Sequence, residues 1–97
     1  WSSFPPHTHV EPEIYFYKFL PENGYGYAEV GDTVYKVHHN DATCMAHGVT
    51  HSQATAPGYA EYYIWAIRLR DNDPMVTTVV REHAWVAEKD AKYFPEI

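Results

Sequence analysis

Two histidines one residue apart, His7 and His9, lie close to the start of the sequence. In an extended strand, alternate side chains point to the same face, so both imidazoles can face one point in space. Imidazole nitrogens are common ligands of divalent transition-metal ions. The pair therefore predicts part of a metal site, whose other ligands must come from elsewhere in the chain.

Glu13 is the next carboxylate that opens a predicted strand. A fully extended chain would carry it about 13 Å from His9, too far for both side chains to share one ion. The segment 10–12 contains a proline and can reverse the chain, so that a strand from Glu13 returns beside the strand of His7 and His9. Glu11 lies within this bend, and we expect it to face water.

A third imidazole completes the predicted site. His51 follows Gly48, which allows a tight turn before the next strand. Three imidazoles and one carboxylate leave one or two positions on an ion open, as a catalytic site requires. The predicted metal ligands are His7, His9, Glu13 and His51. Zinc is the first candidate for the divalent ion, and manganese, iron and nickel also suit this set of ligands.

Short strands must position these residues. Aromatic and β-branched residues suit a pleated surface, and they predict strands over 13–19, 25–30, 34–38, 42–45, 59–70, 76–80 and 84–86. The turn signal Asn23-Gly24 predicts that the first two of these strands pair as a hairpin. No stretch of ten or more residues has a convincing helical period. The pattern predicts an all-β fold, an antiparallel sandwich or barrel of the jelly-roll type.

Composition narrows the classes of partner. The 97 residues carry 7 Lys+Arg against 13 Asp+Glu, a formal net charge of −6, so neither nucleic acid nor a membrane is an expected partner. Cys44 is the only cysteine, which fits a reducing, cytoplasmic location, and we expect it to be a small buried hydrophobic residue. A chain this short buries only about 60 to 65% of its unfolded surface, so we also expect a homo-oligomer.

The metal-site residues resemble the two signatures of the cupin superfamily. The first signature, two histidines one residue apart followed by a glutamate, is matched by His7, His9 and Glu13. The second signature is matched by Gly48 and His51. The resemblance implies a cupin-type double-stranded β-helix with a metal ion inside it.

Longer segments narrow this resemblance. Residues 1–9, 13–17 and 56–65 are similar to the C-terminal half of 5-deoxy-glucuronate isomerase. The related 5-keto-4-deoxyuronate isomerase is similar in the same places, particularly at residues 7–9 and over 51–65. Both families are two-domain cupins with a metal ion in the C-terminal half. The resemblance implies that residues 1–97 are a single cupin domain, incomplete at its N-terminal end, from the C-terminal part of a longer two-domain chain.

The activity implied by the resemblance is a metal-dependent isomerisation, in inositol catabolism, between the aldose and ketose forms of a uronate-derived sugar acid. The partner would then be a small sugar-acid substrate, and a general base must move a proton between adjacent carbons. The candidate catalytic residues are Tyr15, Tyr17 and Glu61. Tyr63 and Trp65 are expected to fill the barrel instead of lining a pocket. Two alternatives keep the barrel: a non-enzymatic sugar-binding module of a regulator, and a metal-dependent cupin oxygenase.

Overall fold

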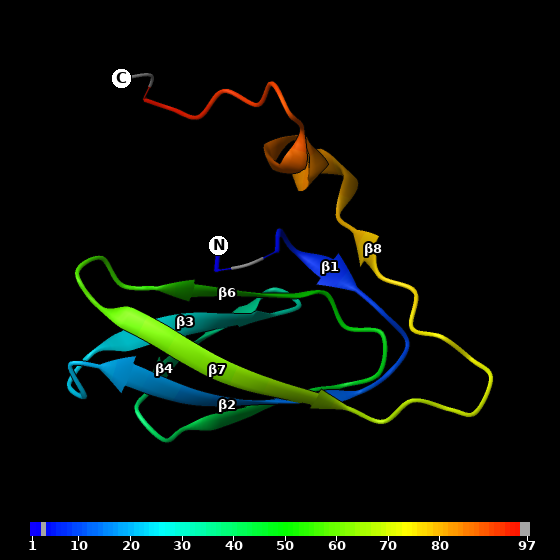
Figure 1. Cartoon of the computed structure of the whole chain (residues 1–97), viewed down its shortest axis with the longest axis horizontal. Helices are drawn as coiled ribbons and strands as arrows, with labels where there is room; N and C mark the ends of the chain where they lie inside the picture. Colours follow the sequence, from blue (N-terminus) through cyan, green and yellow to red (C-terminus); the bar gives the residue numbers. More distant parts are fainter. Residues whose placement is uncertain (3, 96–97) are drawn as a thin grey trace.

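The computed structural model describes residues 1–2 and 4–95, which form two antiparallel sheets that face each other (Figure 1). The five-stranded sheet has the order β4-β3-β6-β1-β8, with β1 at His7–Thr8, β3 at Tyr25–Val30, β4 at Thr33–His38, β6 at His51–Thr55 and β8 at Thr78–Val79. The three-stranded sheet has the order β5-β2-β7, with β2 at Glu13–Leu20, β5 at Ala42–Met45 and β7 at Ala60–Ile67. The predicted all-β fold class is confirmed, although the described strands form two sheets and not one closed barrel.

Strand β2 supplies much of the core, because its side chains alternate between buried and exposed along all eight residues. Tyr15, Tyr17 and Phe19 point inward, and the rings of Tyr15 and Tyr17 stack at an interplanar angle of 14°. Val37 and Met45 pack against this row from β4 and β5. Aromatic side chains bury more apolar surface than any others, so three of them in one strand compensate for the short length of the chain. The inward face of β2 therefore joins the two sheets.

The predicted hairpin between the first two long strands is wrong. Strands β2 and β3 lie in different sheets, and the turn at Asn23-Gly24 carries the chain from one sheet to the other. The hairpin partner of β3 is β4, through a turn in which Gly31 has a φ of 60°. A turn signal indicates where the chain bends and not which strand the next segment joins.

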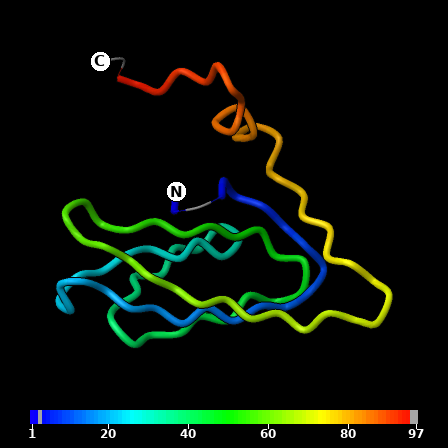
Figure 2. The backbone as a smooth tube through the Cα atoms, viewed as in Figure 1, coloured from blue at the N-terminus to red at the C-terminus, as the bar shows by residue number. Residues whose placement is uncertain are grey.

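Beyond β7 the chain leaves the three-stranded sheet, runs beside β1 as strand β8 of the five-stranded sheet, and continues to its C-terminal segment (Figure 2). The strand predicted to reach residue 70 ends at Ile67, and only Thr78–Val79 of the predicted strand 76–80 is paired, with β1. The predicted strand 84–86 is wrong, because these residues belong to a 3-10 helix, η1, at Arg81–Ala87. No helix in the described part of the chain is long and apolar enough to cross a membrane.

Cys44 points outward from β5 and is exposed, so its predicted burial is wrong. Strand β5 is an edge strand of the three-stranded sheet. Side chains on the two faces of a strand alternate, and Met45, the next residue, takes the buried face. Which side chains of β5 are buried therefore depends on the register of this strand against β2. In that register Cys44 lies opposite Ile14, which is exposed.

Replacement of Gly26 by alanine is expected to destabilise the sandwich. A Cβ atom at this position would lie 2.5 Å from the carbonyl oxygen of Ala54 in the neighbouring strand β6. A backbone oxygen cannot move without disturbing the ladder of hydrogen bonds, so we expect the free energy of unfolding to fall by about 1 to 3 kcal/mol. Urea denaturation would measure the change, with the exposed Thr33→Ala at the far end of the same hairpin as control. An unchanged midpoint for Gly26→Ala would contradict this close approach.

Candidate metal centre

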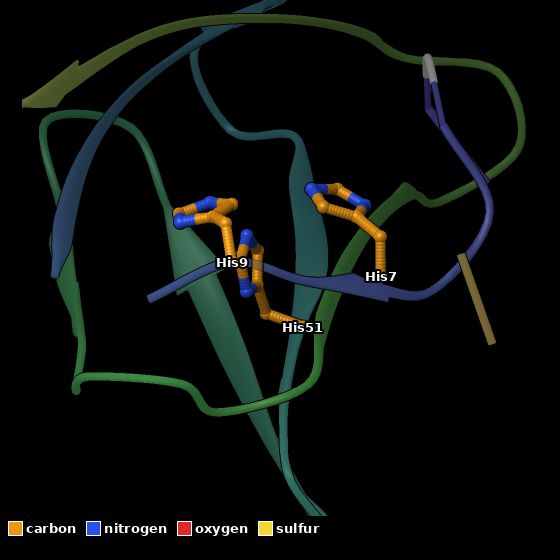
Figure 3. Close-up of side chains that lie close together, drawn as sticks. All are labelled: His7, His9 and His51. Carbon is orange, nitrogen blue, oxygen red and sulfur yellow. The ribbon is translucent and has the colours of Figure 1, made fainter. Parts of the chain in front are cut away.

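Three imidazoles meet where β1 and β6 pair (Figure 3). His7 lies directly opposite His51 in the register of these two strands, so the two side chains project from neighbouring positions. His9 follows His7 by two residues and turns to the same side. One ring nitrogen from each histidine lies within 4.8 Å of the corresponding nitrogen of the other two. Sequence positions more than 40 residues apart are thus brought to one point by strand pairing.

Each of the three rings is held by its Nδ1 atom at a backbone carbonyl. The distances are 2.9 Å from His7 to Pro5, 2.9 Å from His9 to Glu11, and 3.0 Å from His51 to Val49. A carbonyl oxygen can only accept a hydrogen bond, so each Nδ1 must carry the proton. In a neutral ring the lone pair is then on Nε2, which is the arrangement that metal-binding histidines use.

Two further features fit a cation between these rings. The Nε2 atom of His51 is buried and makes no hydrogen bond within the described chain. The carboxylate oxygen Oε2 of Glu13 lies 2.6 Å from Nε2 of His9 and 3.4 Å from Nε2 of His51. A carboxylate and two lone-pair nitrogens repel one another at these distances unless a proton or a cation lies among them. Three imidazoles and one carboxylate are also a donor set that suits a divalent first-row metal ion.

Glu13 reaches this point by a different route from the predicted one. The strand of Glu13 does not lie beside β1, because β1 and β2 belong to opposite sheets. The segment 10–12 crosses between the sheets, and Glu13 meets the histidines across the interior. The prediction that Glu11 faces water is also wrong, since Glu11 is only 8% exposed and its backbone carbonyl holds the ring of His9.

The protonation of the cluster follows from burial and from its internal contacts. Burial lowers the pKa of His7 and outweighs the opposing effect of the Pro5 carbonyl, which favours the neutral ring that a metal requires. Burial disfavours a charged Glu13, but the contacts with His51 and Tyr15 outweigh it and lower the pKa of that carboxyl. For His51, burial is outweighed by the neighbouring Glu13, which raises the pKa of the imidazole.

Metal binding is expected to weaken as the pH falls. An imidazole must be neutral to bind a metal, and the raised pKa of His51 allows protons to compete at a higher pH than at an ordinary histidine. Glu13 has a lowered pKa and stays ionised over this range. We therefore expect metal to be released between about pH 6.5 and pH 5. Elemental analysis of chain equilibrated at a series of pH values would measure this release, and full occupancy at pH 4 would contradict it.

A cavity of about 300 Å³ opens beside the cluster. Its lining residues are Ser2, Phe4, His7, His9, Glu13, Tyr15, Ser52, Gln53, Tyr63, Trp65, Met75 and Thr77. The prediction that Tyr63 and Trp65 fill the interior is wrong for Trp65, which is half exposed and forms part of this wall, whereas Tyr63 packs against the core and also lines the cavity. The volume is at the lower end of the range for small-molecule pockets, so it suits a molecule about the size of a single sugar.

The three candidate catalytic residues lie in different surroundings. Tyr15 lines the cavity, and its hydroxyl donates a hydrogen bond to the Glu13 carboxylate. Tyr17 and Glu61 are not part of the lining that the structure describes. The Tyr17 hydroxyl is buried against Gln53, and the Glu61 carboxylate accepts a hydrogen bond from Ser2. Burial is the main cause that raises the pKa of all three side chains.

Sequence reasoning did not find two kinds of lining residue. Gln53 has the same parity as His51 in strand β6, so strand alternation could have indicated that it points inward. Phe4 and Met75 lie outside the regular strands of the structure and carry no periodic signal. Such positions become visible only when the whole chain is folded.

Two facing antiparallel sheets that enclose a histidine cluster and a small cavity define a cupin-like protein with a candidate metal centre. A comparison with family models matches residues 1–86 to the KduI/IolB family. The chain therefore belongs to this family of cupin-fold isomerases, which act on 5-deoxy-glucuronate and 5-keto-4-deoxyuronate. The resemblance noted in the sequence is thereby confirmed. Neither a search of curated proteins nor a search of solved structures returned a significant match.

Proposed function

We propose that this chain carries the metal centre of an isomerase that interconverts the aldose and ketose forms of a uronate-derived sugar acid, of the 5-deoxy-glucuronate type. The main support is the group of three imidazoles, two of them buried, and the Glu13 carboxylate beside a sugar-sized cavity. Membership of an isomerase family supports the class of reaction. The family thus indicates the type of reaction, and the histidine cluster indicates where in the chain it would take place.

The proposed metal ligands are His7, His9, His51 and Glu13. Their donor atoms suit zinc first, with manganese, iron and nickel as alternatives. When bound, such an ion acts as a Lewis acid that polarises a carbonyl group and stabilises negative charge on its oxygen. The three backbone carbonyls that hold the rings keep the Nε2 atoms directed at the site before the ion arrives.

Tyr15 is the candidate catalytic residue that is best placed in this site. It lines the cavity, and burial raises the pKa of its hydroxyl, so the group is protonated near neutral pH. It can therefore donate a hydrogen bond or a proton to an oxygen atom of the sugar. Its present acceptor is the Glu13 carboxylate, which it orients. Phe4 and Trp65 add aromatic surface to the wall, against which the apolar face of a sugar ring can pack.

Replacement of Tyr15 by phenylalanine is expected to weaken metal binding about 10- to 100-fold, because it removes the hydroxyl that orients a proposed ligand and keeps the packed ring. Titration of the metal-free chain with zinc would measure the affinity. The exposed Tyr35→Phe is the matched control and should bind zinc as the unmodified chain does. Equal affinities for the two variants would show that the hydroxyl of Tyr15 does not support the ligand.

The proposed activity can be tested directly. The chain would be loaded separately with zinc, manganese, iron or nickel and incubated with 5-deoxy-glucuronate and with 5-keto-4-deoxyuronate, and the products would be followed by NMR. Conversion of either sugar between its aldose and ketose forms is the expected result. Tight sugar binding without conversion would instead favour a sensing module, and oxygen consumption by the iron-loaded chain would favour an oxygenase.

A further inference from the structure

Gln53 carries an unused hydrogen-bond donor at the wall of the cavity. Its side chain is 3% exposed and lines the cavity two residues beyond His51 in strand β6. The amide oxygen accepts a hydrogen bond of 2.6 Å from the hydroxyl of Tyr17. The amide nitrogen is buried and has no partner within the described residues. Buried polar groups without a partner are rare in folded proteins, so this nitrogen calls for an explanation.

The orientation of this amide is set by a chain of hydrogen bonds from the opposite sheet. The Tyr17 hydroxyl also lies 2.8 Å from the hydroxyl of Thr43, on the neighbouring strand β5. Tyr17 has one proton to give, and the oxygen of the amide can only accept it, so Thr43 donates to Tyr17 and Tyr17 donates to Gln53. This order places the oxygen of Gln53 toward Tyr17 and leaves the two N–H groups for another acceptor.

The two serine hydroxyls of the cavity lining are already engaged. Ser2 donates to the carboxylate of Glu61, and Ser52 donates to the carboxylate of Glu29. The lining that the structure describes also includes no lysine or arginine. The amide of Gln53 is therefore a neutral, oriented donor in a cavity whose wall is largely apolar. A sugar acid offers many oxygen atoms that accept such a hydrogen bond.

We propose that Gln53 determines specificity by donating a hydrogen bond from its side-chain amide to an oxygen atom of a sugar-acid ligand, and that Tyr17 is the positioning residue that holds this amide in place. The choice of a sugar acid as ligand rests on the proposed function. Tyr17 thus acts through Gln53 and not by proton transfer to the sugar. A site built to donate to an oxygen atom rejects ligands that lack it, because its donor is then left unpaired.

The test measures binding of D-glucuronate to the zinc-loaded full chain by isothermal titration calorimetry. Gln53→Glu keeps the size of the side chain and its acceptor for Tyr17, but it replaces the donor by a negative charge. We expect its affinity for D-glucuronate to fall at least about 10-fold with unchanged zinc content. Tyr17→Phe should lower the affinity by a smaller factor, because the side-chain amide of Gln53 can then rotate and exchange the positions of its oxygen and nitrogen atoms. Tyr35→Phe, on the surface, should bind as the unmodified chain does.

A second measurement tests the positioning role of Tyr17. The side-chain amide signals of Gln53, identified in ¹⁵N-labelled chain by their absence from Gln53→Glu, should shift when D-glucuronate is added. In Tyr17→Phe without sugar the same signals should be displaced or broadened, whereas the midpoint of zinc binding should not change. Signals that are unmoved by the sugar would overturn the assignment of Gln53, and unaltered signals in Tyr17→Phe would overturn that of Tyr17.

The outcomes separate this inference from the proposed function. Unweakened binding of D-glucuronate by Gln53→Glu would overturn the inference, as would loss of zinc from that variant or failure of the unmodified chain to bind the sugar. The isomerase assay decides the proposed function independently. Weakened binding by Gln53→Glu in a chain that does not isomerise either sugar would refute the isomerase and leave the role of Gln53 supported.

Discussion

Replacement of His51 by alanine is expected to abolish stoichiometric metal binding. His51 is 1% exposed, its Nε2 atom makes no hydrogen bond in the described chain, and it contributes one of three imidazoles. Loss of a residue that merely supports a ligand costs about 10- to 100-fold in metal affinity, so loss of a ligand should cost at least 100-fold. Glu13→Gln, which keeps the shape and removes the charge, should have an effect of similar size.

Elemental analysis of the purified variants would measure the bound metal. His47→Ala is the matched control, because His47 is an exposed histidine four positions earlier in the chain and lies outside the cluster. It should retain full stoichiometry. Circular dichroism would show that His51→Ala is folded. One metal ion per chain in His51→Ala or in Glu13→Gln would remove that residue from the proposed set of ligands.

Removal of the metal by a chelator is expected to lower the isomerisation rate at least about 1000-fold, since a Lewis acid contributes several kcal/mol to stabilising charge in the transition state and each 1.36 kcal/mol is a factor of ten. Adding back the metal should restore the rate. The fold should survive, because the core around Tyr17, Phe19 and Met45 is built from apolar packing outside the cluster.

Near-UV circular dichroism of the chelated chain would show whether its aromatic core is intact. The chelator should have no further effect on His51→Ala, which serves as the control for direct action on the protein. An isomerisation rate that persists in a chain without detectable metal would refute the metal-dependent reaction, even if the ligand assignment were correct.

Those features of the protein that depend on local backbone geometry follow from the residue pattern alone. The two-residue period of β2 puts Tyr15 and Tyr17 on the same face as Glu13, and all three side chains are buried. The same rule applied to His7 and His9 predicts two imidazoles on one side, which the structure shows. Strand alternation is a property of the extended backbone itself and needs no knowledge of the rest of the fold. His51 was proposed as the third imidazole from the turn at Gly48, and the family resemblance supports the same residue.

Only the tertiary structure decided which sheet each strand joins. Turn residues indicate a bend but do not specify which strand the next segment pairs with. For this reason the sequence predicts a hairpin of β2 and β3, whereas in the structure the chain crosses there from one sheet to the other. That crossing brings Glu13 to the histidines from the opposite sheet. It also places Tyr17 against Gln53, a contact between residues 36 positions apart. Contacts of this kind depend on how two sheets pack, and packing is a property of the whole chain.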